Sequence, residues 1–289
     1  MHAVVFAYHD VGVNCLKALL NAGIQVDLVV THQDDPSENV WFGSVAKLCQ
    51  EKNISYITPS ASDLPGLIPK LEKLAPDYIF SFYYRHMIPA QILACAKIAA
   101  LNMHGSLLPK FRGRAPVNWA ILHGETETGA TLHVMEAKPD AGDIVGQASV
   151  SIGPDETATD VFGKVSSAAV EVIHQVLPEL IQGRVPRKPN DLQNGSYFGG
   201  RKPTDGQIHW NQSAGQVHNL VRAVAPPYPG AFTDHEGTTM IVAKTSLKGP
   251  FPANLNLEAT GIQVVDNRVF GICGDRQVVE VLEWFPASK

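Results

Sequence analysis

Short apolar runs alternate with amphipathic stretches through the first part of the chain. An apolar run of about four to eight residues indicates a buried strand, and apolar residues three or four apart indicate one face of a helix. This pattern predicts strands at 3–8, 24–31, 54–57, 77–82 and 98–104, with helices at 12–22, 41–52, 63–74 and 89–96. Because strands that alternate with helices form parallel βαβ units, we predict an α/β domain with a doubly wound, mostly parallel, Rossmann-like sheet.

The same spacing continues to residue 182 and then changes. It predicts a helix at 116–123, strands at 129–136 and 144–152 around the loop 139–143, and a long helix at 156–182. Proline, glycine and asparagine punctuate residues 184–206, which indicates a linker across the surface of the first domain. Short β-like runs follow at 230–234, 239–244, 260–265, 269–273 and 277–282. We therefore expect a first domain at 1–186, a linker at 187–204 and a small, OB-like β-barrel domain at 205–289.

The composition is typical of a soluble globular protein. Hydrophobic residues make up 45% of the 289 positions and charged residues 18%, and the net charge of −5 argues against a broad nucleic-acid-binding surface. The four cysteines are widely spaced without a CxxC pair, which favours reduced thiols and argues against a zinc site. The N-terminus lacks the features of a signal peptide, and no apolar stretch is long enough to cross a membrane. We therefore expect a cytoplasmic protein without membrane insertion.

Residues 98–116 carry the strongest chemical signal. Side chains alternate along a strand, so Asn102 and His104 point to the same face at the end of the predicted strand. Ligands of open α/β sheets bind beyond the carboxyl ends of the strands. A lone histidine there is more often structural, but the loop that follows carries Arg112 and Arg114, which can meet a phosphate or carboxylate. This combination is suited to attack on a carbonyl.

The remaining chemical signals are weaker. Asp140 lies in the stretch KPDAGDIV, which is either a simple turn or the source of a carboxylate that reaches His104 and raises the pKa of the imidazole. His9 and Asp10 alone do not make a metal site, and no HExxH pattern occurs. The sequence also lacks the GxGxxG, GxxxxGK[ST] and GxSxG patterns. Dinucleotide, P-loop and serine-hydrolase chemistry are therefore unsupported.

Three separated pieces together resemble the 10-formyltetrahydrofolate-dependent formyltransferases. The family pattern is an Asn-x-His pair, a following SLLPxxRG loop and a distant Asp-x-Gly. This sequence has Asn102 and His104, then SLLPKFRG at 106–113, then Asp140-Ala141-Gly142. The resemblance covers the whole chain, with a formyltransferase domain first and a small β-barrel last. The stretches VVFAYHD (4–10), IFSFYYRH (79–86), LLPKFRGRAPVNW (107–119) and HGETETGATLH (123–133) are most similar to the formyltransferase domain of the UDP-4-amino-4-deoxy-L-arabinose enzyme of lipid A modification.

The resemblance implies transfer of a formyl group from 10-formyltetrahydrofolate to the 4-amine of that nucleotide sugar, a step in polymyxin resistance, without a metal. Asn102 and protonated His104 would stabilise the developing oxyanion, and His104 would also move protons. Asp140 would hold His104 and raise its pKa. The implied folate site consists of His86, Met87, Ile88, Arg114 and the segment Glu136, Ala137, Lys138, Pro139 and Asp140.

In the enzyme that this chain resembles, a decarboxylase domain follows the transferase. This chain ends at Lys289, so we expect a stand-alone transferase or a fragment of a bifunctional enzyme, with a decarboxylase domain or partner in the same pathway.

The acceptor is less well defined than the reaction. Methionyl-tRNA formyltransferase performs the same chemistry, but residues 205–289 hold six lysines and arginines against eight aspartates and glutamates, whereas a tRNA-binding domain is normally basic. The loop 32–39, HQDDPSEN, is acidic as well. A nucleotide sugar fits better, and Arg112, Arg201 or Lys202 would meet its diphosphate. Another nucleotide-linked amino sugar and a non-catalytic folate or nucleotide-sugar binding module are the alternatives.

Overall fold

The computed structural model describes residues 1–35 and 39–287. The chain divides into two compact units, which we describe separately. The first comprises Met1–Gly113, Thr128–Val150 and Gly163–Phe198, and the second comprises Arg114–Glu127, Ser151–Phe162 and the chain from Gly199 onward. The domain boundaries predicted from the sequence remain a prediction. The acidic loop predicted at 32–39 includes residues 36–38, which lie outside the described residues.

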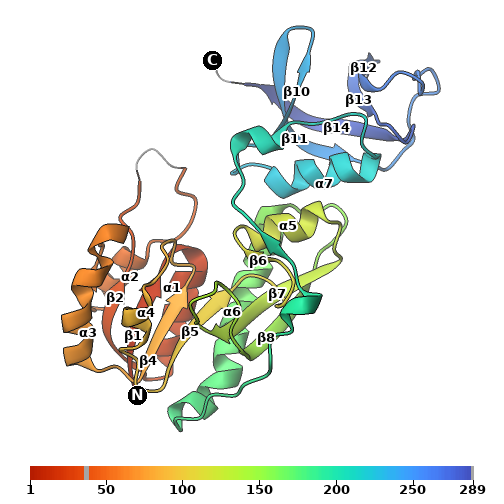
Figure 1. The fold of residues 1–289 in the computed structure, drawn as a ribbon. Helices are drawn as coiled ribbons and strands as arrows, with labels where there is room; N and C mark the ends of the chain where they lie inside the picture. The colour runs from red at the N-terminus through yellow and green to blue at the C-terminus, as the bar shows by residue number, and fades with distance from the viewer. Residues whose placement is uncertain (36–38, 288–289) are drawn as a thin grey trace. The chain divides into compact units, whose positions relative to one another are not determined.

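The first unit contains a seven-stranded sheet in the order β3-β2-β1-β4-β5-β7-β8 (Figure 1). Its strands are β1 His2–Ala7, β2 Gln25–Val30, β3 Tyr56–Ile57, β4 Tyr78–Phe82, β5 Ala99–His104, β7 Glu127–Val134 and β8 Ile144–Ser151. Neighbouring pairs among β1 to β5 are parallel, and β7 runs antiparallel to β5. The chain leaves β5 and enters β7 at the same edge of the sheet, so these two strands must run in opposite directions. The predicted α/β class with a mostly parallel sheet is confirmed.

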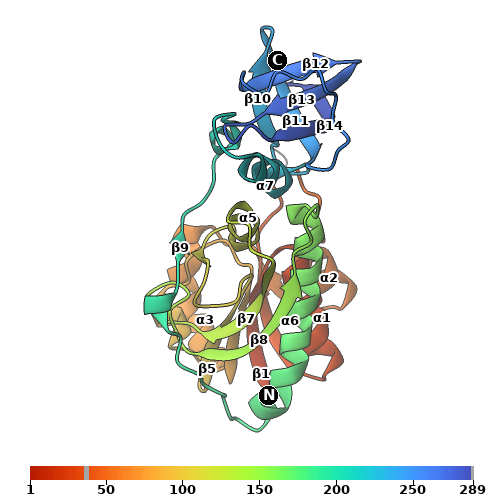
Figure 2. The same cartoon turned by 90° about the vertical axis from the view of Figure 1, so that its right-hand side faces the viewer.

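Helices cover both faces of this sheet (Figure 2). On one face lie α1 His9–Asn21, α2 Val45–Glu51 and α6 Ala158–Ile181. On the other lie η1 Ala61–Leu67, α3 Ile68–Leu74 and α4 Ala90–Leu93, whose residues Leu64, Leu71 and Ile92 share one core cluster. Val4 and Phe6 of β1 pack with Leu71 of α3 in the core of the second face. The helix predicted at 63–74 begins as a 3₁₀ turn that contains Pro65, because proline cannot supply a helical N–H. Among the described residues, no helix combines the length and the apolar character needed to span a membrane.

Residues 188–198, which we call the strap, hold two loops of the first unit. Lys188 exchanges two backbone hydrogen bonds with Ile144, of 2.8 and 2.9 Å. The strand β9 (Tyr197–Phe198) pairs in parallel with β6 (Arg112–Gly113). The hydroxyl of Ser196 accepts the backbone N–H of Phe111 at 2.8 Å. The strap therefore fixes the loop after β5 and the start of β8.

The second unit consists of two helices and an antiparallel sheet (Figure 1). The helices are α5 Pro116–Leu122 and α7 Ala214–Val224, and the 3₁₀ turn η3 Pro203–Gly206 precedes α7 in the same unit. The sheet has the order β10-β11-β14-β13-β12, from β10 Ala231–His235, β11 Thr238–Ser246, β12 Gly261–Val265, β13 Arg268–Ile272 and β14 Val278–Pro286. It curls around a small core of Phe270, Ile272 and Val278, which confirms the predicted small β domain.

The sequence pattern missed α7. Its start could be read from the sequence, because Ser213 and Gln216 form a capping box. Most of the helix is buried, and it packs against β11 and β14.

We expect Gly129→Ala to destabilise the protein. A Cβ at position 129 would lie 2.1 Å from the carbonyl oxygen of Ala148 on β8 and 2.7 Å from Cδ2 of Leu107, so the backbone has to shift. Overpacking of this kind costs about 1–3 kcal/mol. The free energy of unfolding, measured by urea titration, checks this. Gly66→Ala is the control, because nothing lies within 4 Å of its added Cβ, and equal losses in both variants would contradict the close packing.

Candidate active site

His104 lies at the end of β5, at the carboxyl edge of the parallel strands. Its imidazole is buried, and Nε2 lies 2.8 Å from the carbonyl oxygen of Phe111. Because a carbonyl oxygen only accepts, Nε2 carries a hydrogen and donates it. Nδ1 lies 3.6 Å from Oδ1 of Asp140. The structure thus brings together the histidine and the carboxylate whose proximity the sequence left open.

Asp140 lies in the loop after β7, in the left-handed backbone region with φ of 50°. Its Oδ2 accepts the backbone N–H of Gly113 at 2.9 Å. The side-chain amide of Asn190, in the strap, donates to the carbonyl oxygens of Asp140 and Gly142 at 3.1 and 3.2 Å. Gly142 allows the loop to fold back, because a Cβ there would lie 2.1 Å from the carbonyl oxygen of Val134. These contacts hold the Asp140 carboxylate in one position.

The Asp140 carboxylate is ionised at neutral pH. Burial by itself would raise the pKa of this carboxyl, but His104, His133 and the backbone N–H of Gly113 together hold the pKa well below its usual range. With 12% of its side chain exposed, Asp140 is a largely buried negative charge at the end of the sheet.

His104 has a pKa below its ordinary value of 6.5, mainly because the imidazole is buried. Asp140 and the Phe111 carbonyl raise the pKa, and His133 lowers it. The resemblance implied that Asp140 raises the pKa of His104 and that the imidazole is protonated. The carboxylate acts in that direction, but burial outweighs it. The structure therefore favours a neutral imidazole at neutral pH.

The sequence interpretation missed His133, which lies on β7 directly opposite Asn102 of β5. His133 is 2% exposed. Its Nε2 lies 3.1 Å from Nδ2 of Asn102 and 3.3 Å from Oδ1 of Asp140. A histidine in the predicted strand 129–136 was visible in the sequence, but the strand that would pair with it was not. His133 therefore connects two of the three residues predicted to be catalytic.

The predicted folate residues His86, Met87 and Ile88 follow β4. Met87 is 66% exposed, whereas the ring of His86 packs edge-on against His32, with 4.6 Å between centroids. His32 in turn stacks on Tyr84 at 4.2 Å. Burial lowers the pKa of His32 to about 4, so this ring is neutral at neutral pH.

A second group of rings adjoins them at the carboxyl ends of β1 and β2. Tyr8 packs edge-on against both His32 and Phe42, with 5.0 and 5.1 Å between centroids. His9 stacks on Phe42 at 3.9 Å and contacts Trp41 edge-on. Neutral, closely packed rings offer flat surfaces to an aromatic ligand. The sequence motifs gave no signal for these two groups of rings, because their members follow three different strands, β1, β2 and β4.

The other predicted folate residues lie in both units. Glu136, Ala137 and Lys138 are exposed in the loop that leads to Asp140, and Pro139 is half-buried. Arg114 is exposed and belongs to the second unit.

The side chains of His9 and Asp10 accept hydrogen bonds from backbone N–H groups. Nδ1 of His9 accepts the backbone N–H of Asp10 at 2.9 Å, and Oδ1 of Asp10 accepts that of Gly43 at 2.8 Å. Within the described part of the chain, no three His, Cys, Asp or Glu side chains are grouped so that they could share a metal ion.

Arg112, predicted to meet a diphosphate, lies on β6 in the first unit. Its side chain is buried, with 8% exposed, and Nε has no hydrogen-bond partner among the described residues. The neighbours of Arg112 in sequence both contact the site, because the Phe111 carbonyl accepts from His104 and the Gly113 N–H donates to Asp140. A buried guanidinium with an unpaired N–H is costly unless an anion binds to it.

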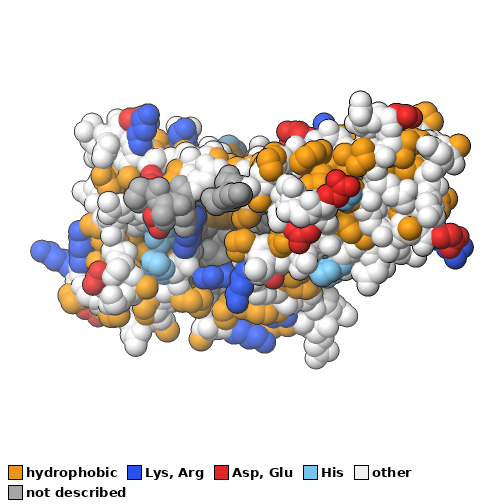
Figure 3. All heavy atoms as spheres, turned by 90° about the horizontal axis from the view of Figure 1, so that it is seen from above, with side chains coloured by type: hydrophobic (Ala, Val, Ile, Leu, Met, Phe, Trp, Pro, Cys, Tyr) orange, Lys and Arg blue, Asp and Glu red, His pale blue; other side chains and the backbone are white. Residues whose placement is uncertain are grey.

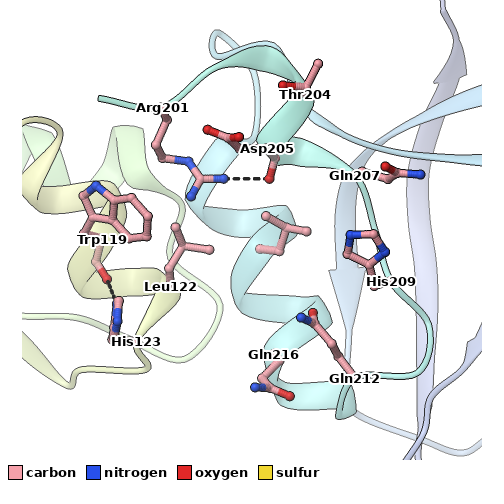
Figure 4. A pocket seen from close by; sticks show the side chains of 11 residues that line it. Trp119, Leu122, His123, Arg201, Thr204, Asp205, Gln207, His209, Gln212 and Gln216 are labelled. Carbon is pink, nitrogen blue, oxygen red and sulfur yellow. Dashed lines mark hydrogen bonds between the residues drawn. The ribbon is translucent and has the colours of Figure 1, made fainter. Parts of the chain in front are cut away.

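Arg201 and Lys202 lie in the second unit, where Arg201 lines a pocket of about 440 Å³ between α5, η3 and α7 (Figure 4). The guanidinium of Arg201 lies 5.0 Å over the ring of Trp119, and its Nη2 donates to the carbonyl oxygen of Asp205 at 2.8 Å. The backbone N–H of Lys202 donates to Oδ2 of Asp205 at 2.7 Å. Arg201 is therefore held in place at the wall of this pocket.

Solved structures of several sugar N-formyltransferases share this fold. WlaRD, a sugar 3N-formyl transferase solved in the presence of dTDP and 5-N-formyl-THF, matches with a TM-score of 0.74 and 20% identity, over 100% of this chain and 98% of that chain. The N-formyltransferase from Helicobacter canadensis, in complex with folinic acid and dTDP-3-aminofucose, matches with a TM-score of 0.74 and 20% identity. The match covers 98% of this chain and 99% of that chain. A 4-N formyltransferase from Francisella tularensis matches with a TM-score of 0.66 and 24% identity, over 82% of this chain and 94% of that chain.

These identities establish a common fold and no more. Family models extend the comparison to the sequence. The formyl transferase model matches residues 2–177, and the model of the formyl transferase C-terminal domain matches residues 201–289. The chain therefore belongs to the formyl transferase family and is a formyltransferase.

Proposed function

We propose that the protein transfers a formyl group from 10-formyltetrahydrofolate to the amine of a nucleotide-linked amino sugar. The buried pair of His104 and Asp140 beside Asn102 carries the proposal, since it combines a proton carrier, a fixed negative charge and an amide at one strand end. Relatives that bind folinic acid and dTDP-3-aminofucose, or dTDP and 5-N-formyl-THF, support this class of substrates. The sequence resemblance favours the 4-amine of UDP-4-amino-4-deoxy-L-arabinose, and with it lipid A modification and polymyxin resistance.

The residues then act in the following way. The acceptor amine forms a bond to the formyl carbon, the bond from that carbon to N10 of the folate breaks, and one proton moves from the amine to N10. His104 starts neutral with its hydrogen on Nε2, takes the amine proton on Nδ1 and returns it to N10. Asp140 stays ionised and stabilises the imidazolium formed between these two transfers. The amide N–H of Asn102 stabilises the negative charge on the formyl oxygen.

The first unit offers surfaces that fit the folate co-substrate. The loop His86–Met87–Ile88 adjoins stacked neutral rings, which suit a flat pterin, and the exposed thioether of Met87 is adaptable to an aromatic partner. The folate supplies an activated formyl group when it binds. The sequence resemblance adds Glu136 to Asp140 and, in the second unit, Arg114 as further proposed folate contacts.

Arg112 supports an anionic acceptor. In the sequence Arg112 stands between the two residues whose backbones contact His104 and Asp140, and its buried Nε is unpaired among the described residues. A phosphate oxygen at this position would satisfy the guanidinium. Arg201 and Lys202 remain proposed contacts to the diphosphate. A nucleotide-linked sugar carries such a group, which is the physical reason to prefer it to a neutral sugar.

Methionyl-tRNA is the second candidate acceptor. The face of the second unit seen in Figure 3 carries acidic and hydrophobic side chains side by side, which does not suit a polyanion. Among the exposed large hydrophobic residues of this unit are Val264, Leu282, Trp284 and Phe285. These features favour the nucleotide sugar.

The proposal is tested by incubating the protein with 10-formyltetrahydrofolate and a panel of acceptors. The panel contains UDP-4-amino-4-deoxy-L-arabinose, other UDP- and dTDP-linked amino sugars, and initiator methionyl-tRNA, and the formylated product is detected by mass spectrometry. We expect formylation of a nucleotide-linked amino sugar. His104→Ala should lower kcat by about 10²–10⁴-fold while the Kd for folinic acid stays within about twofold. Formylation of methionyl-tRNA alone, or full turnover by His104→Ala, would contradict the proposal.

We expect Asp140→Asn to move the acidic limb of the pH profile of kcat/KM to lower pH. The Asp140 carboxylate raises the pKa of His104, so removing its charge lowers that pKa further. Because His104 must be neutral to accept a proton, the variant keeps its competent form to lower pH, although kcat falls at every pH. The titration of the acceptor amine belongs to the substrate and does not move. Asp143→Asn is the control, and an unchanged limb in Asp140→Asn would make Asp140 a turn residue only.

Arg112→Met should raise the KM for the nucleotide sugar by about 10–100-fold, with little change in the KM for the folate. This is the loss of affinity expected when one charge-assisted hydrogen bond is removed. The same variant should raise the melting temperature, because it replaces an unpaired buried charge by an apolar side chain of similar length. Arg184→Met, at an exposed arginine paired with Glu179, is the control. A lower melting temperature with an unchanged acceptor KM would assign Arg112 a purely structural role.

A further inference from the structure

We propose that the pocket between α5, η3 and α7 binds the nucleoside diphosphate part of the acceptor, with the diphosphate at Arg201 and the base among glutamine side chains. The identity of this ligand rests on the proposed function, and the inference adds a place for the base. All residues that line the pocket belong to the second unit. Its volume of about 440 Å³ is typical of small-molecule sites, which range over about 300–1,000 Å³.

Hydrogen bonds hold the walls of the pocket together. The side-chain amide of Asn118 on α5 donates to the carbonyl oxygen of Ala223 on α7 at 2.7 Å. The backbone N–H of Ile208, in the segment after η3, donates to the carbonyl oxygen of Phe232 on β10 at 2.7 Å. The walls are therefore fixed within the second unit, and a ligand can bind without reordering them.

Arg201 forms a positively charged end of the pocket. Its guanidinium lies over the Trp119 ring, and Nη2 donates to the carbonyl oxygen of Asp205 at 2.8 Å. Its Nε and Nη1 have no hydrogen-bond partner among the described residues. Burial lowers the pKa of the Arg201 guanidinium, and Asp205 raises it. A partly buried guanidinium with unused N–H groups favours an anion such as a phosphate oxygen.

Uncharged side-chain amides form the other end of the pocket (Figure 4). Oε1 of Gln216 accepts the backbone N–H of Ser213 at 3.0 Å, and a backbone N–H can only donate. This bond fixes which end of the amide is oxygen, so the NH₂ group of Gln216 remains as a donor. The side chain of Gln212 has no hydrogen-bond partner in the described part of the chain, so it can donate and accept. Leu122 and Leu220 add apolar side chains against which a flat ring can pack.

The distribution of charge selects the ligand. The charged lining residues are Arg201 and Asp205, and Oδ2 of Asp205 accepts the backbone N–H of the adjoining Lys202 at 2.7 Å. Arg201 and Lys202 outnumber Asp205 at this end, whereas the glutamine side chains at the other end are uncharged. A nucleoside diphosphate has the same division, because its phosphates carry its charge and its base is an uncharged ring. The N–H and carbonyl groups of such a base pair well with side-chain amides.

Binding of UDP to the full chain without folate tests this site, with inorganic pyrophosphate as the matched probe that lacks the nucleoside. We expect Arg201→Met to raise the Kd for UDP, measured by calorimetry, by about 10–100-fold, as for the loss of a charge-assisted hydrogen bond. Gln212→Ala should raise the Kd for UDP by about 2–10-fold and leave that for pyrophosphate unchanged. Arg268→Met is the control, because the Arg268 guanidinium lies 4.9 Å over Phe270 in the same unit but outside the pocket.

Pyrophosphate that binds as tightly as UDP, or equal Kd values for UDP in Arg201→Met and Arg268→Met, would overturn the proposal. Melting temperatures of the three variants show whether a loss of binding follows from unfolding. Because Gln212 is exposed, Gln212→Ala keeps the test decisive if Arg201→Met does not fold.

The indole N–H resonances show where UDP binds. Trp119 lines the pocket, Trp41 belongs to the second group of rings in the first unit, and Trp284 is exposed on β14. UDP should shift the Trp119 resonance in ¹H–¹⁵N spectra and leave that of Trp284 unchanged. A shift of Trp41 without one of Trp119 would overturn the proposal.

The failure of this inference and the failure of the proposed function give different results. If the protein formylates a nucleotide sugar but UDP has no effect on Trp119, the proposed function stands and the pocket assignment is wrong. UDP binding at Trp119 without formylation of any acceptor would instead count against the proposed function.

Discussion

The rest of the site depends on the need to stabilise one buried negative charge. The Asp140 carboxylate is largely shielded from water, and an ionised carboxylate in such a place must be surrounded by donors or positive charge. One oxygen receives the N–H of Gly113, and the other faces His104 and His133. These partners come from the loop after β5, from β5 and from β7. A single side chain thereby fixes the relative positions of three segments, and the same electrostatics hold its own pKa low.

The strap holds the backbone of the two loops that position this site. The side-chain amide of Asn190 donates to the carbonyl oxygens of Asp140 and Gly142. The Ser196 hydroxyl accepts the backbone N–H of Phe111, and the carbonyl oxygen of Phe111 accepts the hydrogen bond of His104. A segment with the composition of a linker thus orients both members of the His104–Asp140 pair.

The site contains satisfied and unsatisfied groups, and the difference between them has a chemical meaning. Asp140 accepts the Gly113 N–H and faces two imidazoles, as expected for a group that stays charged throughout a reaction. His104 is kept neutral by burial but has a carboxylate at hand, which suits a group that gains and loses a proton. Arg112 is buried with an unpaired N–H among the described residues, which suits a group that waits for an anion.

Much of this protein could be predicted from its sequence because the relevant physics is local. The alternation of apolar runs and amphipathic stretches predicted the α/β class and the parallel strands, and the two-residue period of a strand placed Asn102 and His104 together. The sequence also contained Asp140, but whether it forms a turn or a contact depends on a loop closed by Gly142 and by the strap. His133 could not be identified from the sequence for a similar reason, since its contact with Asn102 follows from the antiparallel pairing of β7 with β5, and no local signal gives the partner of a strand. Sequence by itself determined which side chains share a face within one element. Only the tertiary structure decided which elements meet, because hydrogen-bond register and buried charge are settled between segments far apart in the chain.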